Sequence, residues 1–137
     1  MIDIIIDLEV NNKSELLEKL VTILYNKDII SNKENLLRSI YEREKIGPTS
    51  IGNNIAIPHG KDNIKEIYIF IAKLKKPILW EDINKFNVSF VILFVIPNNI
   101  NTKINLMCNI CKKLGDDDLC KKLISLNSKK EIIDFLI

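Results

Sequence analysis

The chain of 137 residues contains one histidine, His59, and the residues around it are the first sign of a chemical site. His59 lies between Pro58 and Gly60 and follows the short apolar run Ile55–Ile57. Because proline fixes its own φ angle and glycine permits unusual dihedral angles, this setting can hold the imidazole in one orientation. Such an imidazole can transfer protons, or it can capture a phosphoryl or acyl group as a nucleophile.

A single histidine in a loop is more often simply solvated, so this interpretation competes with the chemical one. Three of the four glycines, Gly47, Gly52 and Gly60, gather in the segment around His59, and this clustering favours a prepared site. One imidazole also excludes sites that need several from the same chain, such as a three-histidine zinc centre or a HExxH helix.

Cysteines are the other candidate ligands. Cys108 and Cys111 form a CxxC pair, Cys120 follows, and together with His59 they would complete a four-ligand zinc site. The signal is weak because a second CxxC is missing and Cys111 falls on the apolar side of an expected helix, where a free cysteine is a common core residue. A zinc or thiol protein stays open as a minor alternative, and we expect no metal.

Loops that bind nucleotides are absent from the sequence. It contains neither a GxxxxGK[ST] loop nor a GxGxxG loop, and it shows no nucleophile elbow. We therefore expect no cofactor. Arg43 stands just before the glycine-containing segment, at the end of an expected helix, and could neutralise a phosphate; the alternative is a solvated cation that complements the helix dipole.

Capping boxes predict three of the helices that position these residues. They begin at Asn12–Glu15, Ser31–Glu34 and Ser128–Glu131, and apolar residues at helical spacing follow each of them. The second helix should end near Lys45, because Gly47-Pro48 interrupts it. Two further helices are expected in the last third of the chain. The first has its apolar side at Ile104, Met107, Cys111 and Leu114 and ends at Gly115, and the second surrounds Leu119, Leu123 and Ile124.

Two segments, Ile67–Ala72 and Val88–Ile96, are almost entirely apolar, which predicts central strands covered by helices on both faces. Residues 73–87 between them are expected to form a connection with at most one edge strand. A short strand at Ile55–Ile57 should lead into a tight exit loop, which places His59 at the carboxyl end of a strand, where α/β proteins bind ligands. We predict one α/β domain over residues 1–137, with a mixed, roughly five-stranded sheet in a three-layer α/β/α arrangement.

Charge and composition narrow the possible partners and the cell compartment. The net charge is +2, from 20 basic and 18 acidic residues, which argues against a nucleic-acid-binding protein. The N-terminus does not resemble a signal peptide, and the apolar run Val91–Pro97 is far too short to span a membrane. Three cysteines crowded into one stretch do not form a secreted disulfide framework, so we expect a cytoplasmic protein.

The segment from Arg43 to Lys61, which contains Ile-Ala-Ile-Pro-His-Gly, resembles the signature of the fructose/mannitol-type EIIA domain of the bacterial phosphoenolpyruvate-dependent sugar phosphotransferase system. The resemblance continues through Leu74–Trp80, the strand end at Val95–Pro97, and Leu114–Leu136. It implies that His59 accepts a phosphoryl group from the carrier protein HPr and passes it to an EIIB domain, without metal or nucleotide. Family precedent places the phosphate on Nε2, with Nδ1 held by a hydrogen bond.

The same resemblance implies a set of residues that support His59: Arg43, Thr49, Gly52, Asn54 and Lys103. Arg43 would help to hold the phosphate, and Thr49 and Gly52 belong to the surrounding loop. Asn54 replaces a family glycine, and asparagine is the residue that best tolerates left-handed dihedral angles in its place. Lys103 stands where the family usually has a second histidine, and it could contact a phosphoryl oxygen as a point charge or simply be solvated.

Two roles remain compatible with this motif. One is transport of a sugar, and the other is a regulatory, nitrogen-related EIIA that acts by binding proteins according to its phosphorylation state. A free-standing chain is expected from Met1 and from the complete pattern of elements.

Overall fold

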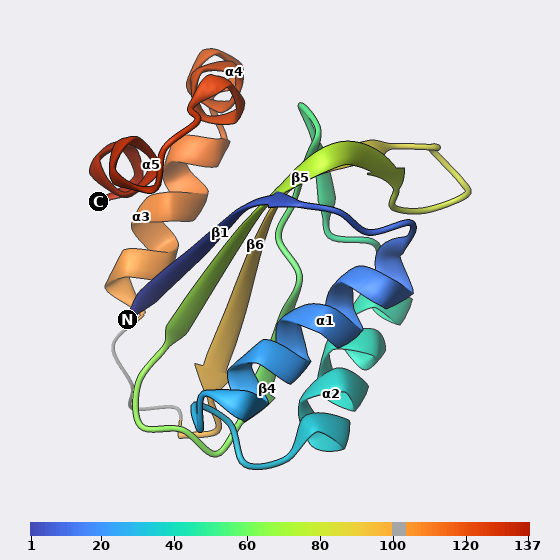
Figure 1. Cartoon of the computed structure of the whole chain (residues 1–137), viewed down its shortest axis with the longest axis vertical. Helices are drawn as coiled ribbons and strands as arrows, with labels where there is room; N and C mark the ends of the chain where they lie inside the picture. The colour runs from blue at the N-terminus through green and yellow to red at the C-terminus, as the bar shows by residue number, and fades with distance from the viewer. Residues whose placement is uncertain (100–103) are drawn as a thin grey trace.

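The computed structural model describes residues 1–99 and 104–137 and shows an open, mixed sheet between two layers of helices (Figure 1). Along the sheet the strand order is β1-β5-β6-β3-β2, and β4 pairs with β6 beyond the end of β3. The strands are β1 (Ile2–Leu8), β2 (Ser50–Gly52), β3 (Ile55–Ala56), β4 (His59–Asp62), β5 (Tyr68–Leu79) and β6 (Asn87–Pro97). The helices are α1 (Lys13–Asn26), α2 (Lys33–Ile46), α3 (Asn105–Leu114), α4 (Asp117–Ser125) and α5 (Lys129–Leu136).

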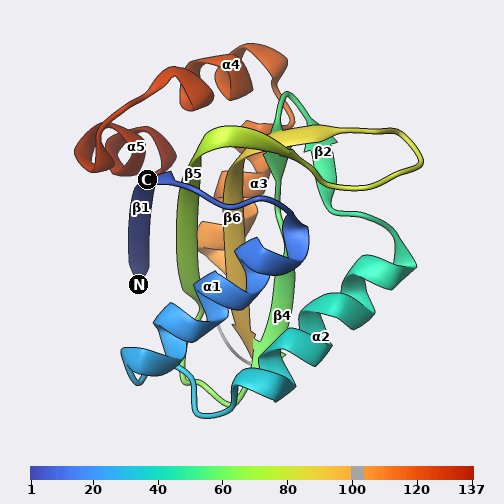
Figure 2. The ribbon, with the colours of Figure 1, turned by 45° about the vertical axis from the view of Figure 1, so that its right-hand side comes forward.

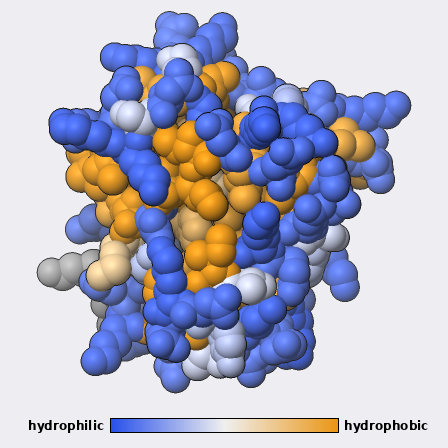
Figure 3. All heavy atoms as spheres, in the orientation of Figure 1, coloured by the Kyte–Doolittle hydropathy of each residue, from blue (hydrophilic) through white to orange (hydrophobic). Residues whose placement is uncertain are grey.

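The predicted α/β class and the three layers are confirmed. Helices α1 and α2 cover one face of the sheet, and α3, α4 and α5 cover the other (Figure 2). Each face has its own apolar core, one built around α1 and α2 and the other around the three C-terminal helices. On the face of the molecule where β1 lies at the sheet edge, apolar side chains gather between the helical layers (Figure 3).

The two central strands carry both cores, as their sequences predict. They run antiparallel, and alternate residues of β5 belong to opposite cores: Phe70 to that of α1 and α2, and Ile69 to that of the C-terminal helices. Strand β5 is longer than expected, because it continues to Leu79 through a register shift between Lys73 and Ile78. That shift lets the strand run through Pro77, whose missing N–H cannot serve a regular ladder.

Helices α1 and α5 begin where their capping boxes predict. In α1 the Asn12 side chain accepts a hydrogen bond from the Glu15 amide, and in α5 the Ser128 hydroxyl accepts from the Glu131 amide at 3.1 Å. The cap of α2 is one residue later than predicted, because Asn32, not Ser31, accepts from a first-turn amide. Asparagine and serine are about equally good N-caps, so the sequence alone does not show which of these two neighbouring residues caps the helix.

The predicted apolar side of α3 is partly wrong. The residues that it buries are Ile110 and Leu114, whereas Cys111 is exposed together with Cys108. Ile110 and Leu114 are four residues apart and so lie on one side of the helix, which faces the sheet. Cys120 of α4 is buried instead, and its thiol donates to the Leu114 carbonyl.

The exit loop predicted around His59 is also wrong. After Pro58 the chain resumes pairing with β6 as the parallel strand β4, which raises the strand count from roughly five to six. The Pro58 carbonyl accepts from the Phe94 amide and bridges the gap between β3 and β4. His59 is therefore the first residue of a strand, opposite Phe94, and not a residue of a free loop.

Candidate functional site

His59 is partly buried, and one of its ring nitrogens has a backbone partner. Its Nδ1 lies 3.2 Å from the carbonyl oxygen of Ile57. Because a carbonyl oxygen can only accept, this contact places the proton of the neutral ring on Nδ1. The lone pair is then on Nε2, which is the arrangement of a nitrogen nucleophile.

Strand β4 is held from one side by β6 and from the other by α2. An ideal Cβ at Gly60 would lie 2.8 Å from Ile40 Cγ1, closer than real contacts allow, and 3.2 Å from the Ile40 amide nitrogen, which is a tight contact. The Lys61 amide also donates to Ser39 Oγ of α2 at 2.8 Å. Gly60 has no left-handed φ angle. Its role is therefore close packing of helix against strand, and not the unusual dihedral angles expected from the sequence.

The C-terminal end of α2 carries a buried carboxylate, Glu44, that the sequence reasoning did not single out. Its side chain is 4% exposed and lies 2.7 Å from Lys13 Nζ of α1. It accepts from the Thr49 hydroxyl at 2.6 Å and from the Trp80 indole nitrogen at 2.8 Å. The signal that could have found it is its place beside Arg43 in the segment that resembles EIIA.

Trp80 has both a packing role and a polar one. It is 3% exposed, within the core beneath α1 and α2. The Lys13 ammonium lies 4.8 Å from the centre of its ring, a cation–π distance. Glu44, Lys13, Thr49 and Trp80 thus form one polar cluster, contributed by α2, α1, the segment before β2 and the residue that follows β5.

Thr49 is connected to His59 through the backbone. It is 4% exposed, and its carbonyl accepts from the Ile57 amide at 3.0 Å. The carbonyl of that same Ile57 faces His59 Nδ1. Of the predicted supporting residues, Thr49 is the one that this series of contacts joins to the imidazole.

Arg43 lies at the end of α2, as expected, and its guanidinium donates to the Gly47 carbonyl at 2.8 Å. This contact ties Arg43 to the residue that follows its own helix, and a role toward a phosphate remains a prediction. Lys103 lies outside the described residues.

Gly52 ends β2, and Asn53 and Asn54 form the turn that leads into β3. Gly52, Asn53 and Asn54 all have positive φ angles, of 83°, 52° and 62°. Asn54 therefore adopts the left-handed conformation expected of it in place of a glycine. Its carbonyl accepts from the amides of Ser89 and Phe90, which attaches the turn to β6.

The cysteines do not form a common site with His59. Among residues 1–99 and 104–137, no group of three or more His, Cys, Asp or Glu side chains is placed to hold a metal ion. Partial burial and the neighbouring Cys108 raise the pKa of the Cys111 thiol. Burial raises the pKa of Cys120 as well, with nearby acidic residues adding to it. A raised pKa disfavours the thiolate, which is the reactive and metal-binding form.

Within the part of the chain that the structure describes, no helix is long and apolar enough to cross a membrane.

Comparison with curated proteins finds both sugar-specific and nitrogen regulatory proteins among the relatives. A 2-O-alpha-mannosyl-D-glycerate-specific EIIABC component of the phosphotransferase system from Escherichia coli (strain K12) is 33% identical over 111 residues, which cover 78% of this chain and 17% of that protein. A nitrogen regulatory protein from Klebsiella oxytoca is 29% identical over 122 residues, which cover 86% of this chain and 75% of that protein. The chain thus spans only a small part of the first relative.

Solved structures share the fold. The nitrogen regulatory protein IIA-Ntr from Neisseria meningitidis has a TM-score of 0.84 at 22% identity, covering 99% of this chain and 96% of that one. Enzyme IIAMtl of Escherichia coli, in its complex with phosphorylated enzyme IIBMtl, has a TM-score of 0.77 at 19% identity, covering 99% and 98%.

The model of the family described as "Phosphoenolpyruvate-dependent sugar phosphotransferase system, EIIA 2" matches residues 2–137. This match covers the whole sheet, both helical layers and the His59 site, and the chain therefore belongs to the EIIA 2 family of the phosphotransferase system.

Proposed function

We propose that this chain is a cytoplasmic phosphocarrier in which His59 Nε2 accepts a phosphoryl group from the phosphohistidine of HPr and passes it to an EIIB domain. The observation that carries the proposal is the contact between His59 Nδ1 and the Ile57 carbonyl, which leaves the lone pair on Nε2. The family match supports it, and so does the fold shared with a protein solved in complex with a phosphorylated EIIB.

The transfer needs few groups from this chain. The Nε2 lone pair forms the bond to phosphorus while the nitrogen–phosphorus bond of the donor breaks and the donor imidazole leaves with its electron pair. His59 Nδ1 keeps its proton and its carbonyl partner throughout. Passage to EIIB repeats the exchange with His59 as the leaving group. Phosphoryl transfer of this kind depends mainly on positioning and on stabilisation of charge.

The test is phosphorylation in vitro. The protein is incubated with phosphoenolpyruvate, enzyme I and HPr from a matched source, and its mass is measured. We expect an acid-labile gain of one phosphate that is lost in His59→Ala, whereas Glu42→Gln, at an exposed side chain of α2, retains it. Absence of the gain in the unaltered protein with matched partners would refute the phosphocarrier proposal.

A regulatory role is the second candidate, and two observations favour it. The nitrogen regulatory relative from Klebsiella oxytoca is matched over 75% of its own length, and a nitrogen regulatory protein shares the fold with a TM-score of 0.84. The two roles differ in the fate of the phosphoryl group. Transfer onward to an EIIB domain from the same organism supports transport, whereas phosphorylation without onward transfer, together with binding of a target protein by one phosphorylation state, supports regulation.

Lys103 can be tested in the same assay. If a lysine in place of the usual second histidine slows transfer, Lys103→His raises the rate of phosphorylation by HPr. An unchanged rate would show that this departure from the family pattern has no effect on transfer.

A further inference from the structure

The buried carboxylate of Glu44 is connected to the imidazole of His59 by hydrogen bonds that run through two intervening residues, Thr49 and Ile57. Glu44 accepts from the hydroxyl of Thr49 at 2.6 Å and from its amide at 3.4 Å. The Thr49 carbonyl accepts from the Ile57 amide at 3.0 Å, and the Ile57 carbonyl faces His59 Nδ1 at 3.2 Å. We propose that Glu44 is a positioning residue for His59: through Thr49 and Ile57 it fixes the carbonyl that keeps the proton on Nδ1 and the lone pair on Nε2.

Glu44 is suited to this role because it is itself held from several directions. Oε1 accepts from Trp80 at 2.8 Å and pairs with Lys13 at 2.7 Å, while Oε2 accepts the Thr49 hydroxyl. These donors come from different parts of the fold, and the carboxylate is almost completely buried. Charge-assisted bonds at a buried carboxylate are short and strong, so its position is well defined.

Thr49 transmits this position to the site. The segment before β2 contains Pro48 and has no helix of its own. On the α2 side Arg43 binds the Gly47 carbonyl, and two bonds to Glu44 hold Thr49 itself. On its other side the Thr49 carbonyl receives the Ile57 amide, which belongs to the same residue as the carbonyl facing the imidazole. A displacement of Thr49 therefore moves the acceptor of His59 Nδ1.

The consequence for chemistry follows from the tautomers of a neutral imidazole. Which ring nitrogen carries the proton is determined by the hydrogen bonds that the ring makes. Without a fixed acceptor at Nδ1, the proton can occupy Nε2 and block the nucleophile. This consequence for transfer rests on the proposed phosphocarrier function, whereas the positioning of the ring does not.

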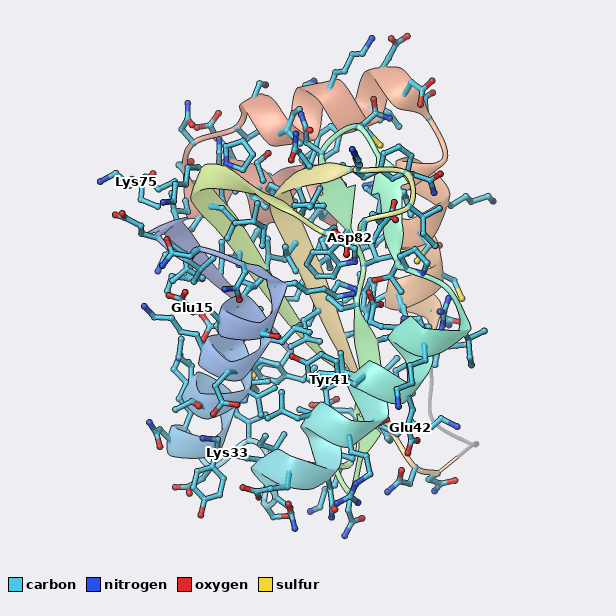
Figure 4. The ribbon with its side chains drawn as sticks, turned by 90° about the vertical axis from the view of Figure 1, so that its right-hand side faces the viewer. Glu15, Lys33, Tyr41, Glu42, Lys75 and Asp82 are labelled. Carbon is cyan, nitrogen blue, oxygen red and sulfur yellow. The ribbon has the colours of Figure 1, made fainter. Side chains whose placement is uncertain are left out.

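Glu44→Gln tests the proposal directly, because it keeps the size of the side chain and replaces one accepting oxygen with an NH2 group that cannot accept. Glu42→Gln is the matched control: it makes the same change on the same helix at an exposed side chain (Figure 4). Thr49→Val removes only the hydroxyl link, and Thr49→Ser retains it. Circular dichroism and thermal melting establish that each variant is folded.

The first measurement is a long-range ¹H–¹⁵N correlation spectrum, recorded where the ring is neutral. Since His59 is the only imidazole, its two nitrogen resonances report the tautomer without assignment of other residues. We expect the Nδ1–H form in the unaltered protein, Glu42→Gln and Thr49→Ser. We expect a clear gain of the Nε2–H form in Glu44→Gln and Thr49→Val.

The second measurement is the rate of phosphorylation by HPr, which should fall by roughly 10- to 100-fold in Glu44→Gln and Thr49→Val and stay near that of the unaltered protein in Thr49→Ser. A folded Glu44→Gln with an unchanged tautomer overturns the proposal, whatever its transfer rate. If Glu44→Gln does not fold, an unchanged tautomer in Thr49→Val has the same force. If Glu44→Gln changes the tautomer but HPr does not phosphorylate even the unaltered protein, the positioning role of Glu44 stands and the phosphocarrier function is refuted.

Discussion

The Nδ1 nitrogen of His59 lies 3.2 Å from one backbone carbonyl, that of Ile57. His59 follows Ile57 by two residues, and its ring turns back so that Nδ1 meets that carbonyl. Pro58 between them fixes its own φ angle, which favours this local return of the chain. The imidazole is thus oriented by its nearest neighbours in the sequence, while the neighbours are oriented by Thr49 and Glu44.

The three cysteine thiols should differ from one another in their reactivity. In the folded protein an alkylating reagent is expected to modify the exposed Cys108 and Cys111 and to spare the buried Cys120. Because the pKa of Cys111 is raised, less of it is thiolate near pH 8, so it should react more slowly than in the unfolded chain. Peptide mass spectrometry after timed alkylation measures both effects, and rapid labelling of Cys120 in the native state would contradict the structure.

At the scale of elements, helix α2 decides where the site lies. Asn32 caps its first turn, and Ile40 in its middle packs against Gly60 of β4. Its last turn contains Glu44. One helix therefore supports both the strand that begins with His59 and the segment that contains Thr49.

The cap of α2 can be tested by paired substitutions. Asn32→Ala should lower the free energy of unfolding by about 1 kcal/mol, because it removes the acceptor of the Asn35 amide. Ser31→Ala is expected to change it by less than about 0.5 kcal/mol, as for other exposed positions. Urea unfolding measures both free energies. A larger loss of stability in Ser31→Ala than in Asn32→Ala would show that Ser31 is the cap.

The packing of α2 on β4 makes a second prediction. Gly60→Ala should destabilise the protein by about 1–3 kcal/mol, because the new methyl group meets Ile40 at 2.8 Å. Gly47→Ala is the control: no heavy atom lies within 4 Å of its added Cβ, and its φ of 174° is extended backbone. Chemical denaturation of the two variants should separate them clearly, and equal stabilities would argue against the close contact.

At the scale of the whole molecule, the two helical layers share one sheet, so they should unfold together. Within Ile69–Ala72 of β5 and Phe90–Val95 of β6, successive residues alternate between the two cores. Loss of either helical layer would expose one face of the central strands and remove the support for both cores. A single cooperative transition is therefore expected for a chain of this size.

The single tryptophan provides a test of this cooperativity. Trp80 lies in the core beneath α1 and α2, whereas Ile132 of α5 lies fully buried in the opposite core. Ile132→Ala should destabilise the protein by about 2–5 kcal/mol and shift the Trp80 fluorescence transition and the circular-dichroism transition equally. A fluorescence midpoint that stays in place while the helix signal shifts would mean that the layers unfold independently.

The sequence by itself determined the elements whose signals are local. The central strands follow from unbroken apolar runs and the α1 and α5 starts from capping residues; the left-handed Asn54 follows from the conformational tolerance of asparagine. The tertiary structure decided what depends on partners distant in the sequence. His59 begins a strand because β6 offers it a pairing edge, Gly60 is small because α2 crosses it, and Cys111 is exposed because Ile110 and Leu114 face the sheet. Glu44 gained its place in the site only when folding brought Lys13, Thr49 and Trp80 around it, since a charge of this kind is tolerated inside a protein only with such partners.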